Sequence, residues 1–139
     1  MLVRVLPLPV ILDTNFLTVP AQFGVDVFSE AERVLERSIE FILLKSVLDE
    51  IKTKFERAGK TESRLFKVAL DLTERCKIVA VDQSMEGSMV DDQLLEYAAA
   101  VKGVLATNDR ELQRRAIERG IPILILRGRK HLELRGTIF

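Results

Sequence analysis

The stretch Pro-Val-Ile-Leu-Asp-Thr-Asn, residues 9–15, begins with an apolar run typical of a buried strand and ends in a short polar turn that starts at Asp13. A second stretch, Gly-Val-Leu-Ala-Thr-Asn-Asp at residues 103–109, has the same order of apolar and polar residues and ends at Asp109. Strands that are apolar throughout are expected where helices cover both faces of a sheet. Both stretches therefore predict buried strands of an α/β protein, each followed closely by an acidic residue.

Apolar runs alternate with amphipathic helical patterns along the rest of the chain, as in an α/β fold. The predicted strands are Pro9–Asp13, Ile39–Leu44, Lys77–Val81, Gly103–Ala106 and Pro122–Leu126. The predicted helices are Asp26–Arg37, Ser46–Ala58, Glu62–Arg75, Asp91–Lys102 and Asp109–Arg119. No internal repeat or linker interrupts this alternation, so the 139 residues are expected to form one domain, 1–139.

The composition is that of a globular protein, because 47% of the residues are hydrophobic and 30% are charged. The apolar start, residues 1–12, is too short to span a bilayer, so we expect no membrane association. A single cysteine, Cys76, permits no internal disulfide and favours a reducing compartment. The cytoplasm is therefore the expected location.

Positive and negative charges balance overall, with 21 residues of each sign, but they are unevenly distributed. Cations outnumber acids in residues 45–67 and 110–135, whereas residues 82–92 between them are rich in acid. A phosphodiester substrate would suit basic walls around an acidic centre. The alternative is that these cations are solvated on helix surfaces and paired with glutamates one turn away.

Four acidic residues stand where strand-forming runs end: Asp13, Glu50, Asp92 and Asp109. The carboxyl ends of parallel strands meet at one edge of a sheet, so these side chains are expected to converge. Convergent carboxylates raise one another's pKa values unless a cation offsets the repulsion, and Mg2+ and Mn2+ prefer oxygen ligands. The set predicts a metal-dependent enzyme, although each acid taken alone is also explained as a helix cap or a partner of a helix dipole.

In their order along the chain, these motifs resemble those of the PIN-domain nucleases. The matching segments are Val-Ile-Leu-Asp-Thr-Asn at 10–15, Val-Leu-Asp-Glu-Ile at 47–51, Val-Asp-Asp-Gln-Leu-Leu-Glu-Tyr-Ala at 90–98 and Leu-Ala-Thr-Asn-Asp-Arg-Glu-Leu at 105–112. The resemblance implies a three-layer α/β/α sandwich around a central parallel sheet of about five strands. It also implies an active site of three or four acids that binds Mg2+ or Mn2+ and hydrolyses RNA.

The resemblance assigns catalytic and metal-binding roles to four residues: Asp13, Glu50, Asp92 and Asp109. Asn15 and Thr107 match supporting positions, where they are expected to hydrogen-bond around the ligands. Asp91 remains an alternative to its neighbour Asp92. The Asp-x-Leu spacing selects Asp92, whereas the Asp-Asp pair resembles the PIN proteins associated with ribosomal RNA processing.

A metal ion in such a site can activate water and neutralise the charge that develops during hydrolysis of a phosphodiester. The expected partner is single-stranded or looped RNA. Its phosphate backbone is expected to contact a cation cluster after the last predicted strand, Arg127, Arg129 and Lys130.

Several functions share this chemistry. A ribosomal RNA processing enzyme, a VapC-type toxin of a toxin–antitoxin pair, and a non-catalytic RNA-binding or assembly protein with the same fold all stay open. The sequence itself indicates no antitoxin partner. A homodimer is a further option, because related domains are often dimers.

Overall fold

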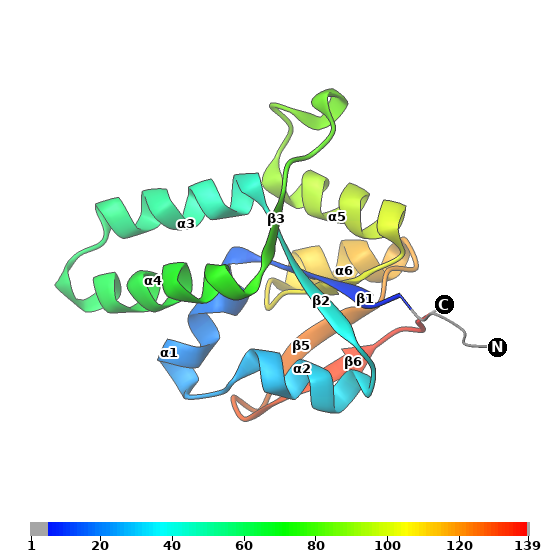
Figure 1. The fold of residues 1–139 in the computed structure, drawn as a ribbon, viewed down its shortest axis with the longest axis horizontal. Helices are drawn as coiled ribbons and strands as arrows, with labels where there is room; N and C mark the ends of the chain where they lie inside the picture. Colours follow the sequence, from blue (N-terminus) through cyan, green and yellow to red (C-terminus); the bar gives the residue numbers. More distant parts are fainter. Residues whose placement is uncertain (1–5, 139) are drawn as a thin grey trace.

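A computed structural model describes residues 6–138, and its centre is a six-stranded sheet with the strand order β3-β2-β1-β4-β5-β6 (Figure 1). The strands are β1 (Leu8–Leu12), β2 (Ile39–Leu44), β3 (Lys77–Val79), β4 (Val104–Ala106), β5 (Ile123–Arg127) and β6 (His131–Arg135). The first five strands are parallel, and β6 runs antiparallel to β5. The first five residues of the apolar start lie outside the described part of the chain.

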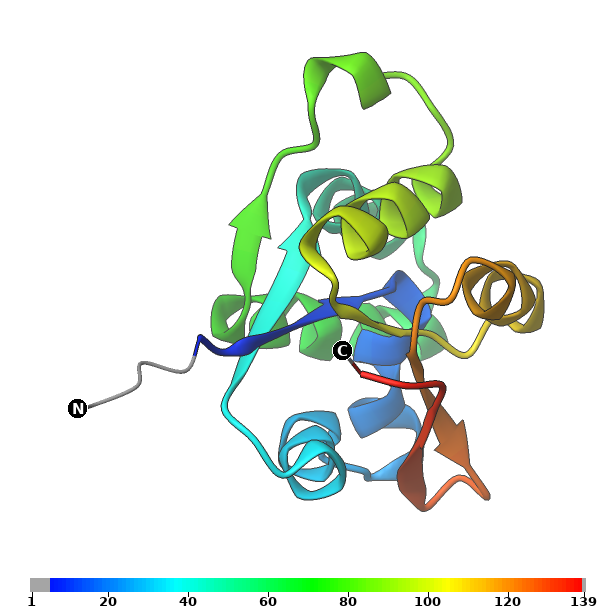
Figure 2. The same ribbon diagram turned by 90° about the vertical axis from the view of Figure 1, so that its right-hand side faces the viewer.

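Helices cover both faces of this sheet. They are α1 (Val19–Phe23), α2 (Val27–Leu35), α3 (Lys45–Arg57), α4 (Lys60–Leu72), α5 (Val90–Val101) and α6 (Arg110–Glu118), with short 3-10 helices η1 (Thr14–Thr18), η2 (Thr73–Arg75) and η3 (Gln83–Met85). Right-handed crossovers place the helices that follow β1 and β2 on one face, and α5 and α6 on the other. Figure 2 shows α5 in front of the sheet and α3 and α4 behind it. The predicted α/β/α sandwich is confirmed.

The structure adds a strand that the sequence analysis did not predict. The basic segment after β5 is a hairpin turn that leads into β6. Gly128 and Arg129, the central residues of the turn that the Lys130 amide closes on the Arg127 carbonyl, have positive φ angles of 61° and 58°, as a type I′ turn requires. The alternation His-Leu-Glu-Leu-Arg in β6 buries Leu132 and exposes His131 and Arg135. β6 is therefore an edge strand, and the predicted RNA-binding cations lie at the end of β5 and in the turn that leads into β6.

The sequence analysis predicted no element between the first strand and the helix at Asp26–Arg37, and the structure has two short ones there. These elements, η1 and α1, fold a short segment back onto the core, where Phe16, Leu17 and Val19 are buried. This segment contacts α4. It thereby holds the turn at the end of β1 between the sheet and the helices.

Close contact between β1 and the end of α5 aligns the two central strands. A Cβ atom at Gly103 would lie 2.7 Å from Ile11 Cδ1 and 2.8 Å from the carbonyl oxygen of Pro9, so only glycine fits there without a shift. The register then pairs Leu12 of β1 with Ala106 of β4. The residues that follow these two strands are consequently neighbours.

Strand order reverses at this pair, since β2 and β3 lie beyond β1 while β5 and β6 lie beyond β4. The carboxyl ends of parallel strands at such a reversal are where α/β proteins place their sites.

No helix within residues 6–138 has both the length and the apolar character that crossing a bilayer requires.

Candidate active site

Asp13 lies at the carboxyl end of β1, and its side chain is buried with only 7% exposure. Its backbone amide donates to the carbonyl of Ala106 at 3.0 Å, which joins the ends of β1 and β4. The amide of Thr14 donates to Asp13 Oδ1 at 2.7 Å. Asp13 therefore caps η1, which is the alternative role that the sequence offered for this acid. Capping occupies only one of its two carboxylate oxygens.

The second oxygen of Asp13 accepts a hydrogen bond from Thr107 Oγ1 at 2.7 Å. Thr107 is fully buried, and its hydroxyl also accepts from the amide of Asp109 at 3.1 Å. One threonine side chain thus positions the acid after β1 and the backbone of the acid after β4. The role of Thr107 as a support for metal ligands stays a prediction.

Asp109 is the N-cap of α6, where its Oδ1 accepts from the amide of Leu112 at 3.0 Å. Asn15 supports the same loop, because its Oδ1 accepts from the amide of Asn108 at 3.3 Å. Asn108 in turn accepts from the amide of Leu126 at 3.1 Å. The loop after β4 is consequently fixed to the turn after β1 and to the end of β5.

Glu50 lies in α3 and approaches the site from the other side of β1. Its carboxylate forms an ion pair with Lys54 at 3.4 Å, and its side chain is 35% exposed. The negative charge of Glu50 contributes to raising the pKa values of Asp13 and Asp91. Glu50 is therefore close enough to interact with two acids from other elements.

Asp91 and Asp92 both lie in the first turn of α5, but they have different surroundings. Asp92 forms an ion pair with Arg115 of α6. Burial raises the pKa of the Asp91 carboxyl, and the charges of Asp109, Glu50 and Asp92 raise it further, whereas Arg115 opposes the rise. The carboxyl of Asp91 thus interacts electrostatically with acids outside α5, whereas Asp92 has Arg115 as its ion-pair partner.

Asp13 also interacts with Asp91 rather than with Asp92. Burial raises the pKa of its carboxyl, the hydrogen bonds from Thr107 and Thr14 oppose that rise, and the charges of Asp91 and Glu50 add to it. We define the acid cluster as Asp13, Glu50, Asp91 and Asp109. A divalent cation would offset this repulsion, and an all-oxygen donor set is one that Mg2+ and Mn2+ accept.

Within residues 6–138, no three Asp, Glu, His or Cys side chains are grouped as a ready-made metal site. Two members of the cluster use an oxygen as a cap, and Glu50 is paired with Lys54. The donor chemistry fits a hard divalent ion, and the buried hydroxyl of Thr14, which has no hydrogen-bond partner in the described residues, is a further polar group beside Asp13. Side-chain rotation would be needed to bring the carboxylates together on one ion.

Sequence reasoning missed two residues of this site. Thr14 was quoted within the motif without a role, although its burial beside Asp13 makes it part of the site. Arg115 is the cation whose ion pair with Asp92 distinguishes that residue from Asp91. Its only sequence signal was membership of a basic helix, which does not reveal its partner on α5.

The predicted RNA-binding cations are at the same end of the sheet. Arg127 ends β5, and its guanidinium contacts Glu133 at 3.3 Å. Arg129 lies in the turn with its guanidinium 5.7 Å from the centre of the Phe23 ring. Lys130 completes the turn by donating its amide to the carbonyl of Arg127 at 3.3 Å. The three cations thus have different partners, and their contact with RNA stays a prediction.

Two hollows flank the acids. One of about 580 Å3 lies between α3 and α4, where its lining includes Glu50, Lys54, Arg57 and Phe66. The other, of about 560 Å3, has a lining that includes Asn108 and lies beside the end of β5 and the start of α6.

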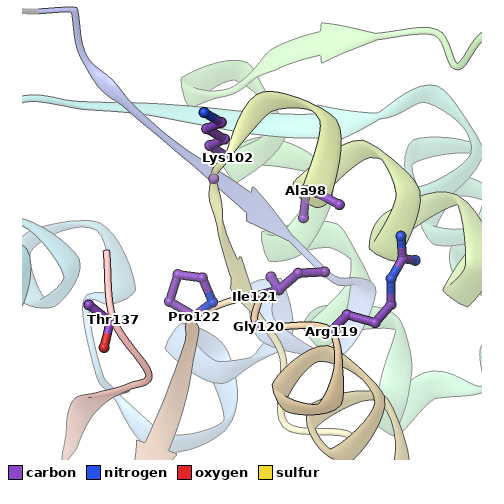
Figure 3. Close-up of a pocket in the computed structure, with 9 residues that line it drawn as sticks. Ala98, Lys102, Arg119, Gly120, Ile121, Pro122 and Thr137 are labelled. Atoms are coloured by element: carbon purple, nitrogen blue, oxygen red, sulfur yellow. The ribbon is translucent and has the colours of Figure 1, made fainter. Parts of the chain in front are cut away.

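A third hollow, of about 130 Å3, lies at the opposite edge of the sheet (Figure 3). Gly103 and Pro122 in its lining precede β4 and β5, so it faces the strands' amino ends. Lys102 and Arg119, also in the lining, follow the last turns of α5 and α6, where cations interact favourably with helix dipoles. This hollow does not belong to the acid site.

Most of the chain is similar to known proteins. A family model described as "PIN like domain" matches residues 10–129. Ribonuclease VapC4 of Methanocaldococcus jannaschii is 28% identical over 127 residues, which are 91% of this chain and 95% of that protein. The structure of the PIN domain endonuclease Utp24 has a TM-score of 0.78 and 24% identity, and the match covers 95% of this chain and 94% of that one. The family match includes every member of the acid cluster.

Proposed function

This chain belongs to the PIN-domain nuclease family, and on that premise we propose that it is a metal-dependent endoribonuclease whose active site is the acid cluster. The observation that carries the proposal is the buried carboxylate of Asp13, which accepts hydrogen bonds from Thr107 and Thr14 and whose pKa is raised by the charges of Asp91 and Glu50 as well as by burial. Such a concentration of negative charge is costly without a cation.

In this proposal, Asp13 and Asp91 are the principal ligands of a Mg2+ or Mn2+ ion, and Glu50 and Asp109 bind the ion or orient its water. When bound, the ion supplies an activated water molecule and neutralises charge on the phosphodiester. Asp91 takes the place that the Asp-x-Leu spacing predicted for Asp92, because Asp91 interacts with the other acids while Asp92 is paired with Arg115.

The remaining residues of the site position these ligands. Thr107 restrains one oxygen of Asp13, which leaves the carboxylate a defined orientation. Arg115 pairs with Asp92 and lowers the pKa of Asp91, so it partly offsets the negative charge at the start of α5. Asn15 and Asn108 connect the turn after β1 to the loop after β4. Preorganisation of this kind matters because misplaced ligands are costly in a metal site.

The test of this proposal is cleavage of a closed circular RNA, which an exonuclease cannot attack. The protein is first stripped of metal with a chelator and then assayed with and without Mn2+ or Mg2+. We expect linear product only when metal is present, and no product from Asp13→Asn. Cleavage that persists in excess chelator, or that survives in Asp13→Asn, would contradict the proposal. Circular dichroism of the variant verifies that its fold is intact.

Two biological roles fit this activity. Ribosomal RNA processing is supported by the resemblance of the Asp-Asp pair to that subgroup, and a toxin role by the similarity to Ribonuclease VapC4. We propose the processing role in the cytoplasm as the first candidate. Induced expression in a bacterial host separates the two: a toxin stops growth in a manner that Asp13→Asn abolishes, whereas a processing enzyme leaves growth unchanged.

A further inference from the structure

The hollow beside α6 combines three arginines with no acidic residue in its lining. Arg110, Arg127 and Arg135 line this space of about 560 Å3, which we call the arginine hollow. Arg127 and Arg135 share a single carboxylate, Glu133, at 3.3 Å from each. Arg110 makes no ion pair with any described residue. Three guanidinium groups against one carboxylate leave two positive charges in excess.

These arginines are available to an anionic ligand. The side chains of Arg127 and Arg135 are 57% and 48% exposed, and exposed ion pairs contribute little to stability. A phosphate can therefore replace Glu133 as their partner at small cost. Guanidinium groups bind phosphate through two parallel hydrogen bonds, a geometry that lysine does not provide.

The arginine hollow is connected directly to the acid cluster. Asn108 and Gln113 are also part of its lining. Asn108 stands between Thr107 and Asp109 in sequence, and Gln113 Nε2 donates to the carbonyl of Thr107 at 2.8 Å. The loop that orients Asp13 thus also lines the hollow. Along the chain, Asn108 of the hollow is next to Thr107, which contacts Asp13.

An aromatic residue completes the lining. Phe23, at the end of α1, is half-buried, and the guanidinium of Arg129 lies 5.7 Å from its ring centre. Aromatic rings accompanied by arginine are a common platform for single-stranded bases, because every base can stack without regard to sequence. The hollow therefore offers groups for both parts of a nucleotide.

We propose that the arginine hollow binds the nucleotide adjacent to the scissile phosphate, with its phosphate on Arg110, Arg127 and Arg135 and its base against Phe23. This inference rests on the proposed ribonuclease function and adds a binding subsite to it. The contacts to phosphate position the RNA without reading its sequence. Arg110 and Arg135 thereby join Arg127 as RNA contacts, while Lys130 has no place in this subsite.

The first test measures RNA binding in an Asp13→Asn background, which keeps the RNA intact. A labelled single-stranded oligonucleotide is titrated at several salt concentrations. We expect Arg110→Ala to bind about tenfold more weakly and to flatten the salt dependence by about 0.7 log units per tenfold change in salt. Arg110→Lys should keep the salt dependence but lose part of the affinity. Arg114→Ala is the matched control, since Glu111 and Glu118 already hold that guanidinium.

The second test locates the contact along the RNA. Single phosphates around the cleavage site are replaced by uncharged methylphosphonates, one position at a time. The background protein should lose affinity by about tenfold at one flanking position, and Arg110→Ala should lose nothing further at that position. Phe23→Leu should weaken binding several-fold without changing the salt dependence, because stacking involves no counterion release. Melting temperatures verify that each variant is folded, and Arg127→Ala repeats the test at a second guanidinium.

The outcomes separate this inference from the proposed function. If wild-type protein cleaves RNA but Arg110→Ala and Arg127→Ala match the background in affinity and salt dependence, the arginine hollow is not a nucleotide subsite. Equal sensitivity of background and Arg110→Ala to every methylphosphonate would overturn it as well. If wild-type protein neither cleaves nor binds RNA, the proposed function fails and this subsite fails with it.

Discussion

Substitution of the two adjacent aspartates in α5 should have opposite consequences. Asp91→Asn removes a carboxylate from the acid cluster, whereas Asp92→Asn removes the partner of Arg115. Loss of a supporting residue in a metal site typically costs 10- to 100-fold in activity, so loss of a direct ligand should cost at least about 100-fold. Asp92→Asn should stay within about fivefold of wild type, since it leaves the charge of the cluster unchanged.

Stability should change in the reverse order. The raised pKa of Asp91 means that the metal-free folded protein holds its charge less favourably than the unfolded chain does. Asp91→Asn should therefore leave the melting temperature unchanged or raise it at neutral pH. Asp92→Asn breaks a half-exposed ion pair, so the melting temperature should fall by on the order of 1–3 °C.

The assay combines RNA cleavage under single-turnover conditions with thermal melting in chelator. Both variants keep the volume of the side chain, so differences in packing are small. The reasoning would be refuted if Asp92→Asn were inactive while Asp91→Asn retained activity, because the Asp-x-Leu spacing would then identify the ligand and the helix orientation in the structure would not.

Three further predictions concern the residues around Asp13. Burial raises the pKa of Asp13 above its ordinary value of 3.8, so the metal-free protein gains stability as pH falls from neutral through the folded-state pKa. In chelator, the melting temperature of Asp13→Asn should exceed that of wild type at neutral pH and the gap should narrow on acidification; a gap that widens contradicts this sign. Thr107→Val should lower RNA cleavage by about 10- to 100-fold while Thr107→Ser retains it, and equal activity of both would show that the hydroxyl positions nothing. Gly103→Ala should reduce the free energy of unfolding by about 1–3 kcal/mol in a urea titration, because its Cβ would overlap Ile11 and Pro9. An unchanged urea midpoint would mean that β1 moves away from residue 103 without cost.

Much of this architecture could be predicted because local patterns and global topology agree. Apolar runs identified the five parallel strands, and the rule that their carboxyl ends meet predicted that Asp13 and Asp109 lie near each other, where Thr107 now links them by hydrogen bonds. The sixth strand was missed because Gly128 and the cations beside it resemble a solvated tail. The hairpin turn pairs β6 with β5, and this pairing buries Leu132.

The choice between Asp91 and Asp92 could not be made from spacing alone. Adjacent residues on a helix point about 100° apart, so the rotation of α5 about its axis decides which one faces the acids. That rotation depends on packing against the sheet and on Arg115 from α6, which is distant in sequence. The arginine hollow could not be predicted from the sequence either, since only the folded sheet brings Arg110 and Arg135 to the same hollow as Arg127.

Calorimetric titration of Mn2+ into the chelator-treated protein tests the central claim most directly, because it measures the metal site without any RNA. Wild type should bind Mn2+, Asp13→Asn and Asp91→Asn should lose that binding, and Asp92→Asn should bind as wild type does. Absence of Mn2+ binding by wild type, or equal binding by wild type and Asp13→Asn, would contradict the assignment of the acid cluster as a metal site.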